Sequence, residues 1–176
     1  HEWRPHEFRE VFGTTWLVIG VGSIGSAVAE RARALGARVL GHRRRPTRRE
    51  PVDEMLPREA LLDELPRCDV LVLAAPATPE TAAFVDERFL AAMASDSVLV
   101  NVARGALVDE VALLAALDRG RPAAAILDVF ATEPLPAEHP FWRHPHIDLT
   151  PHVASYSLPE SGVEIVIENI RRLVTA

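Results

Sequence analysis

The sequence predicts a single doubly wound α/β domain, in which helices cover both faces of a parallel β-sheet. Short runs of continuously apolar residues alternate with segments of helical periodicity, and such runs are typical of strands buried on both faces. The chain has 176 residues, of which 48% are hydrophobic and 25% charged, enough for one domain with a sizeable core. Neither a repeat nor a linker divides it.

The expected elements follow one another in a regular order. Apolar runs predict strands at residues 15–19, 37–41, 70–73, 98–102, 123–128 and 147–150. Apolar residues at helical spacing predict helices at residues 23–35, 57–65, 86–93, 109–119 and 158–173. The remaining segments are a lead-in at 1–13 and a Pro- and His-rich loop at 129–146. We therefore expect the domain to span 14–157, followed by a C-terminal helical region over 158–176.

Composition and charge exclude several classes of function. The net charge of −6 argues against a nucleic acid or an anionic membrane as partner. No apolar run approaches the ~20 residues of a membrane helix, and residues 1–15 are too polar for a signal peptide, so we expect a cytoplasmic location. The single cysteine, Cys68, provides neither an intrachain disulfide nor a Cys-based zinc site. All 19 basic residues are arginines, which excludes mechanisms that need a catalytic lysine of this chain.

The segment Gly20-Val-Gly22-Ser-Ile-Gly25 lies between the first expected strand and the first expected helix. In that context it predicts a Rossmann-type dinucleotide-binding turn. Gly20 allows the tight turn, Gly22 lets the pyrophosphate approach, and Gly25 lets helix and strand pack closely. The helix N-terminus adds free N–H groups and the positive end of the helix dipole. A tight turn without a ligand is the alternative.

The end of the second strand indicates which dinucleotide is preferred. NAD enzymes place an Asp or Glu there to bind the ribose hydroxyls, whereas Gly41-His-Arg-Arg-Arg-Pro46 is followed by no carboxylate before Glu50. An arginine fork suits a 2′-phosphate, and we expect Arg43 and Arg44 to clamp it. The prediction is NADP(H) in preference to NAD(H); the alternative is that these arginines form a solvated basic loop.

Three separated segments resemble the signatures of one enzyme family. They are Val100-Asn-Val-Ala-Arg-Gly-Ala-Leu-Val-Asp109, Ala125-Ile-Leu-Asp-Val-Phe-Ala-Thr-Glu-Pro134 and Leu149-Thr-Pro-His-Val-Ala-Ser155. With the glycine turn they make the chain similar to the cofactor-binding domain of the D-isomer-specific 2-hydroxyacid dehydrogenases, over roughly residues 10–175. The stretch Glu138-His-Pro-Phe-Trp-Arg-His-Pro145 is similar to the glyoxylate/hydroxypyruvate reductases of that family.

The resemblance implies three catalytic residues. Arg104 would bind the carboxylate and keto oxygen of a small 2-keto or 2-hydroxy acid, His152 would exchange a proton with the substrate oxygen, and Glu133 would pair with His152. The chemistry agrees, because hydride transfer to a keto acid leaves an alkoxide that a histidine beside a carboxylate can protonate near neutral pH. Taken singly, Arg104 and Glu133 could be solvated loop residues, and His152 could be a structural histidine.

The resemblance also implies further contacts with the cofactor. They come from Ser23, Ile24, Ala75, Pro76, Thr81 and Ala103, together with Asp128 at the nicotinamide end. No metal is expected, because the histidines between Glu138 and His152 are irregularly spaced, interrupted by prolines and without a cysteine partner.

Two other functions are alternatives. Some relatives in this superfamily are dinucleotide-sensing corepressors that can retain the same three residues, so a regulatory binding protein without turnover stays open. A methyltransferase also uses a glycine-rich turn, but it has no use for Arg104, Glu133 and His152.

The chain departs from the family in one respect. The substrate lobe that normally precedes the cofactor domain is absent from these 176 residues, which leaves half of the cleft. We expect the isolated chain to bind cofactor with little or no turnover, because half a cleft neither orders the substrate nor excludes water. Family members usually dimerise through this domain, so we expect a homodimer formed by the segment with Trp3, Phe8 and Phe12 and by residues 90–120.

Overall fold

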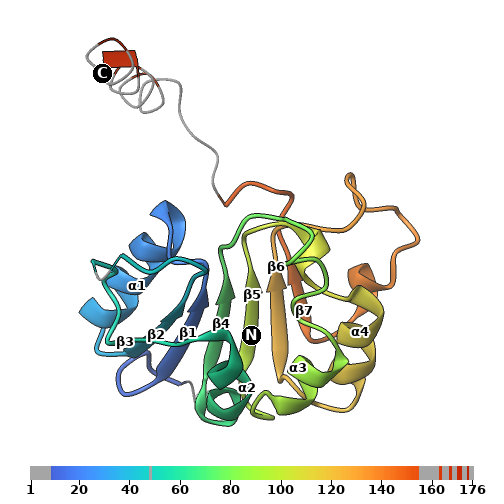
Figure 1. Ribbon diagram of the computed structural model, residues 1–176. Helices are drawn as coiled ribbons and strands as arrows, with labels where there is room; N and C mark the ends of the chain where they lie inside the picture. Colours follow the sequence, from blue (N-terminus) through green and yellow to red (C-terminus); the bar gives the residue numbers. More distant parts are fainter. Residues whose placement is uncertain are drawn as a thin grey trace, which may run out of the picture.

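The computed structural model describes residues 9–47 and 49–154, together with positions 163, 167, 170, 171 and 174. The described residues form one sheet in the order β3-β2-β1-β4-β5-β6-β7, in which all neighbouring strands run parallel (Figure 1). The strands are β1 (Thr15–Ile19), β2 (Arg38–His42), β3 (Glu54–Met55), β4 (Val70–Leu73), β5 (Val98–Asn101), β6 (Ala124–Leu127) and β7 (Ile147–Leu149). The predicted doubly wound parallel sheet is confirmed.

Helices cover both faces of this sheet. They are α1 (Ser23–Ala34), α2 (Leu61–Glu64), α3 (Glu87–Ala92) and α4 (Glu110–Asp118), with short 3-10 helices η1 (Arg58–Ala60), η2 (Leu65–Arg67), η3 (Gly105–Leu107) and η4 (Pro140–Arg143). The helix α1 packs against one face, and α2, α3 and α4 pack against the other. No helix in the described part of the chain is long and apolar enough to cross a membrane.

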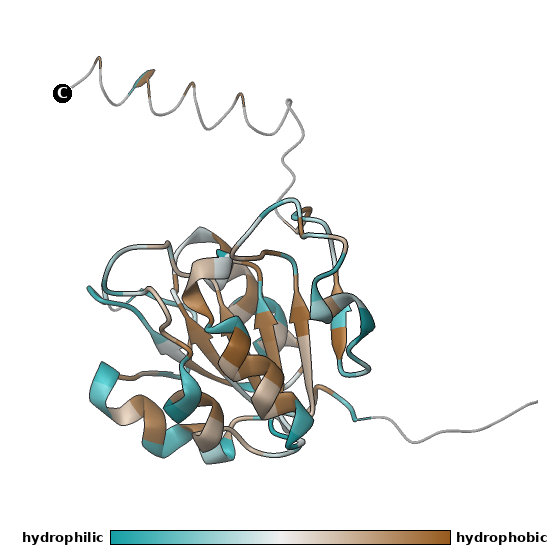
Figure 2. Ribbon diagram, turned by 90° about the vertical axis from the view of Figure 1, so that its right-hand side faces the viewer, coloured by the Kyte–Doolittle hydropathy of each residue, from teal (hydrophilic) through white to brown (hydrophobic). Residues whose placement is uncertain are grey.

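The two-sided burial explains why the strands are continuously apolar. In β1, Leu17 and Ile19 belong to the larger apolar cluster, which includes residues of α2, α3 and α4. Val18 points the other way and packs with Ala29 and Ala32 of α1. Successive side chains of a strand face opposite sides of the sheet, so both sets must be apolar. Figure 2 shows the result: the strands and the helix in front of them are mostly apolar, and the polar residues lie chiefly in loops and outer helix turns.

Two parts of the predicted element order are corrected by the structure. The single helix expected over 57–65 is observed as three short pieces, η1, α2 and η2. The α-helical part ends before Pro66, which lacks an N–H group and stands in η2. The strand β3 was not predicted, since it has two residues, pairs only with Leu40 and Gly41, and carries one exposed and one partly buried side chain. Residues 1–8, and most of the helix expected over 158–173, lie outside the described residues.

The glycine turn follows β1, at the point where the direction of strand addition in the sheet reverses. From β1 the chain continues to β2 and β3 on one side and to β4 on the other, so a ligand crevice forms at the carboxyl ends of β1 and β4. Gly20 has a φ of +96°, and a Cβ atom there would lie 2.4 Å from the backbone nitrogen of Ala75. A Cβ atom on Gly25 would lie 2.2 Å from the carbonyl oxygen of Gly20, whereas one on Gly22 would meet nothing within 4 Å.

The structure gives Gly22 and Gly25 different surroundings, as their different roles in the motif require. We expect Gly25→Ala to lower the free energy of unfolding by about 1–3 kcal/mol, because the methyl group collides with backbone and not with a mobile side chain. Gly22→Ala should change it by less than about 1 kcal/mol, since its φ of −97° suits any residue and its surroundings are open. Urea denaturation measures both; equal losses would contradict this division of roles.

Candidate active site

A cavity of about 770 Å³ opens at the carboxyl ends of β1, β2 and β4. Its lining includes Ile19–Gly22, His42–Pro46, Met55–Arg58 and Ala74–Pro76, with Thr78, Glu80, Thr81 and Phe84. Seven residues expected to contact the cofactor are thereby brought together, namely Gly20, Gly22, Arg43, Arg44, Ala75, Pro76 and Thr81. Ser23, Ile24 and Gly25 form the first turn of α1 directly behind the cavity, whereas Ala103 and Asp128 follow β5 and β6 and do not line it.

The first turn of α1 is suited to an anion. Its N-cap, Gly22, has no side chain to accept a hydrogen bond from the helix, and the first turn contains no acidic residue. The N–H groups at a helix start lack partners within the helix and carry the positive end of its dipole. Phosphate groups are the ligands that such a turn favours.

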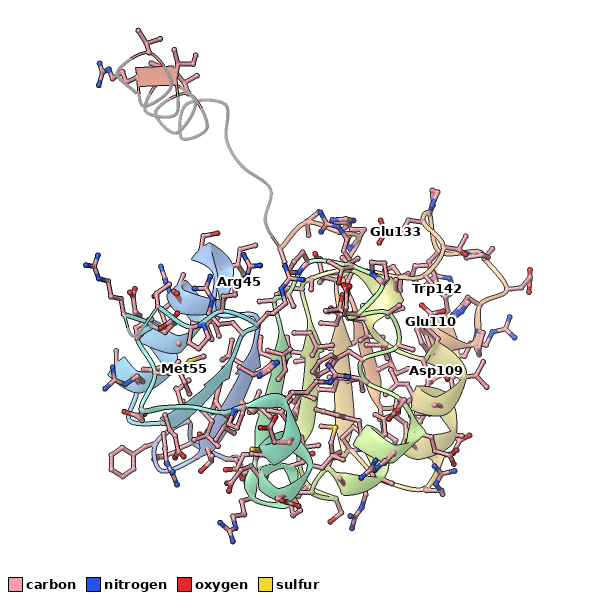
Figure 3. The ribbon with its side chains drawn as sticks, viewed as in Figure 1. Arg45, Met55, Asp109, Glu110, Glu133 and Trp142 are labelled. Carbon is pink, nitrogen blue, oxygen red and sulfur yellow. The ribbon has the colours of Figure 1, made fainter. Side chains whose placement is uncertain are left out.

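The three arginines directly after β2 all line the cavity but differ in their contacts. The Arg43 guanidinium donates to the carbonyl oxygen of Val21 at 2.9 Å and to a carboxylate oxygen of Glu50 at 3.1 Å. Arg44 and Arg45 are exposed, and both line the cavity. Figure 3 shows Arg45 on the left side of the molecule, far from Glu133 on the upper right. The structure therefore divides the arginines into one bound to the protein and two exposed in the lining, and Arg45 was missed by sequence analysis.

Thr81 has a local partner for its side chain. Its hydroxyl donates to the carbonyl oxygen of Pro76 at 2.8 Å and accepts from the N–H of Thr78 at 2.8 Å. These bonds close the turn that follows β4.

Glu133 and His152 form a close polar pair at the other end of the site. Glu133 Oε2 lies 2.7 Å from His152 Nδ1, and Glu133 Oε1 accepts the N–H of Phe130 at 2.9 Å. The His152 hydrogen bond, followed by that from Phe130 and the charges of His152 and Arg104, lowers the pKa of Glu133. An ionised Glu133 holds a proton on Nδ1 and leaves Nε2 for exchange with a ligand. The His152 side chain is 40% exposed, so it is a loop histidine accessible to ligands.

Asp128 holds the loop that carries His152. It is 3% exposed and accepts hydrogen bonds from the Thr150 hydroxyl and from the N–H groups of Val153 (2.9 Å) and Ala154 (3.0 Å). His152 has a φ of +54°, and its N–H donates to the backbone oxygen of Asp128 at 2.9 Å. Burial acts to raise the pKa of Asp128, but the three hydrogen bonds and the charge of His152 outweigh it and lower the pKa.

Arg104 is placed by the turn after β5. Asn101 is 1% exposed; its side chain accepts the N–H of Ala103 at 3.0 Å and donates to the Arg104 backbone oxygen at 3.1 Å. The Arg104 guanidinium donates to the backbone oxygen of Ala103 at 2.6 Å and stays exposed. Ala103 and Arg104 thus form a polar turn at the carboxyl edge of the sheet, between the cavity and the His152 loop.

Two contacts join this turn to the loop of Glu133. A Cβ atom on Gly105 would lie 1.9 Å from the backbone carbon of Phe130, so only glycine lets these backbones meet. Glu110 accepts the N–H of Ala131 at 2.8 Å, and His139 Nε2 lies 3.5 Å from the other Glu110 oxygen. Figure 3 shows Glu110 at the start of α4, below Glu133. Within the described residues, no group of three or more His, Cys, Asp or Glu side chains could hold a metal ion.

The chain matches a known protein family and curated proteins of related sequence. A family model described as D-isomer specific 2-hydroxyacid dehydrogenase, NAD binding domain, matches residues 1–154. A glyoxylate/hydroxypyruvate reductase A of Serratia proteamaculans is 39% identical over 172 residues, which are 98% of this chain and 55% of that protein. The chain therefore spans about half the length of the curated relatives it matches.

Two solved structures resemble the fold. A D-isomer specific 2-hydroxyacid dehydrogenase from Xanthobacter autotrophicus Py2, in complex with NADPH and MES, has a TM-score of 0.89 and 37% identity, over 98% of this chain and 72% of that one. An NADPH-dependent glyoxylate/hydroxypyruvate reductase from Sinorhizobium meliloti, in complex with NADP and sulfate, has a TM-score of 0.89 and 33% identity, over 99% and 57%. These matches confirm the resemblance inferred from the three sequence segments and give no support to the regulatory alternative.

The contacts of Asp128 predict a pH-dependent loss of stability. Asp128→Asn should lower the free energy of unfolding by about 1–3 kcal/mol at neutral pH, because the amide leaves a buried backbone donor without an acceptor. The folded-state pKa of Asp128 is lowered, so its contribution is complete above the ordinary pKa of an aspartate and is lost as pH falls through the folded-state value.

Denaturant unfolding from neutral to acidic pH measures this difference. The gap between wild type and Asp128→Asn should narrow as pH falls. Asp148→Asn, which changes an exposed aspartate of β7, is the matched control and should have little effect. A gap that is constant with pH would contradict the role given to the Asp128 charge.

Proposed function

Because the chain belongs to the D-isomer specific 2-hydroxyacid dehydrogenase family, whose NAD-binding domain it matches, we propose that it serves hydride transfer between NADP(H) and a small 2-keto or D-2-hydroxy acid. The observation that carries the proposal is the Glu133–His152 pair at 2.7 Å, held at the same sheet edge as Arg104 and the cofactor cavity. Carboxylate, imidazole and guanidinium are the groups that the reduction of a 2-keto acid requires.

The mechanism assigns one task to each of the three side chains. Arg104 neutralises the substrate carboxylate and polarises the keto oxygen. His152 gives its Nε2 proton to the oxygen that becomes an alkoxide, and takes it back in the reverse direction. Glu133 orients the ring through Nδ1 and stabilises its protonated form. The nicotinamide, when bound, supplies or accepts the hydride.

The lowered pKa of Glu133 supports this assignment. The hydrogen bonds from His152 and Phe130 favour its charged form, so Glu133 remains ionised down to a pH below the ordinary pKa of a glutamate. The orientation of the histidine is therefore constant across neutral pH. Protonation of Glu133 at low pH removes the acceptor of the Nδ1 proton and with it the orientation of the ring.

For the cofactor we propose NADP(H) in preference to NAD(H). The segment after β2 has no carboxylate facing the cavity, and Arg44 and Arg45 are exposed in its lining. Guanidinium groups bind a phosphate by charge-assisted hydrogen bonds and gain little from a pair of ribose hydroxyls. The Xanthobacter and Sinorhizobium structures, which contain NADPH and NADP, support the same choice.

For the substrate we propose a small 2-keto acid of the glyoxylate or hydroxypyruvate type, as in the names of the Serratia and Sinorhizobium relatives.

We also propose a cytoplasmic homodimer. Phe12 and Val111, in the lead-in segment and in α4, are 76% and 79% exposed and supply apolar surface for the contact. Sedimentation at micromolar concentration tests the dimer, and a monomer there counts against it.

Calorimetric titration of the chain with NADPH and with NADH tests the cofactor proposal. NADPH should bind clearly more tightly. Arg44→Ser should weaken NADPH binding about tenfold and leave NADH binding within about twofold, because one charge-assisted hydrogen bond to the 2′-phosphate is lost. Arg67→Ser, which removes an exposed arginine before β4 at the opposite edge of the sheet, is the control and should change neither affinity. Tighter binding of NADH would overturn the proposal.

A second test separates proton transfer from cofactor binding. In a form of the protein that turns over, His152→Gln should lower kcat about 100-fold or more and leave NADPH affinity within about twofold, because the variant lacks only the proton donor. The 176 residues alone should oxidise NADPH with glyoxylate very slowly, since His152 and Arg104 are open to water. Turnover that survives in His152→Gln would remove His152 from the mechanism.

A further inference from the structure

Glu50 occupies an unusual position for a glutamate in an arginine-rich segment. It follows β2 by eight residues, yet its side chain is 2% exposed. One carboxylate oxygen accepts the Thr47 N–H at 2.7 Å, the Thr47 hydroxyl at 2.9 Å and the Arg43 guanidinium at 3.1 Å. The other accepts the N–H of Arg49 at 3.1 Å. These four bonds fold the segment 43–50 back on itself.

Glu50 does not replace the acid that NAD enzymes use to bind the ribose hydroxyls. Its side chain is enclosed, and both oxygens already accept hydrogen bonds from the segment. Those bonds, led by the one from the Thr47 backbone, lower the pKa of Glu50 to about 2. The carboxylate is therefore ionised throughout the working range of pH, as a fixed internal charge.

The partner of that charge is Arg43. Its guanidinium bridges Glu50 and the backbone oxygen of Val21, which lies between Gly20 and Gly22 of the phosphate turn. Arg43 thus fastens the arginine segment to the turn and has fewer N–H groups left for a ligand. Arg44 and Arg45 are exposed in the cavity lining, and the carboxylate that faces them is Glu80, whose pKa is lowered chiefly by its hydrogen bond with Thr78 and to a smaller extent by the charge of Arg44.

We propose that Glu50 is a positioning residue for cofactor discrimination. By holding Arg43 against the phosphate turn and closing the segment 43–50, it presents Arg44 and Arg45 to the 2′-phosphate. The inference rests on the proposed preference for NADP(H) and names the residue that sets it. Without Glu50, Arg43 loses its carboxylate partner and the segment loses four hydrogen bonds, so the two exposed arginines are no longer held at the cavity.

The test compares affinities for two ligands that differ only in the 2′-phosphate. The chain and its Glu50→Ala variant are titrated calorimetrically with NADPH and with NADH. Glu50→Ala should lose about tenfold or more in NADPH affinity and stay within about twofold for NADH. Glu50→Gln should lie between the two, because it can still accept the Thr47 N–H but carries no charge for Arg43. Glu54→Ala, which removes the exposed Glu54–Arg38 ion pair nearby, should match wild type.

A second variant that removes only one hydrogen bond keeps the test valid if Glu50→Ala does not fold. Thr47→Val removes only the hydroxyl that donates to Glu50, and it should reduce NADPH affinity about threefold without changing NADH affinity. The inference is overturned if Glu50→Ala and Thr47→Val keep the wild-type ratio of the two affinities, or lose both affinities equally. A wild-type chain that does not prefer NADPH overturns the proposed cofactor preference itself and this inference with it, so the two failures are distinguishable.

Discussion

The carboxyl edge of the sheet depends on backbones that approach too closely to admit a Cβ atom. At Gly20 the phosphate turn meets the backbone after β4, at Ala75, and at Gly105 the turn after β5 meets the backbone of Phe130 after β6. Such contacts fix one loop against the next without relying on mobile side chains. The turn that carries Arg104 and the loop that leads to Glu133 are therefore held against each other at the ends of the rigid parallel strands, and this part of the site keeps one geometry.

Two carboxylates with little exposed surface also hold loops at this edge of the sheet, through hydrogen bonds to backbone N–H groups. Asp128 uses its oxygens on the loop of His152, and Glu50 uses its oxygens on the segment of the arginines. Asp128 is 3% exposed and the Glu50 side chain 2%, and hydrogen bonds to an ionised acceptor are stronger than those between neutral groups. The side chains proposed to meet ligands, by contrast, are exposed. The charges that shape the loops and the charges that act on ligands thus belong to different residues.

The sequence could predict the apolar strands and the residues of recognisable motifs, but not the carboxylates that bind irregular loops. The run Val70–Leu73 has its predicted bounds because buried strands are marked by continuous apolar residues. Glu133 and His152, expected from the resemblance to form a pair, lie 2.7 Å apart. The inward turn of Glu50 was not predicted, and Asp128 was expected at the cofactor while its observed partners lie in the His152 loop. Both depend on backbone donors of irregular loops, for which no periodic pattern exists.

The separation of Arg44 and His152 along the edge of the sheet indicates how long a ligand that contacts both must be. Arg44 follows β2 and His152 follows β7, and the sheet order puts five strand spacings between them, about 24 Å. Between these two ends, the phosphate turn after β1 and the turn after β4 line the cavity. Arg104 follows β5, on the side of the cavity toward His152. A compact mononucleotide reaches only one part of this edge. An extended dinucleotide, held as proposed by its 2′-phosphate and its pyrophosphate, would direct its other end toward His152, and the spacing of the parallel strands would then bring the reacting groups together.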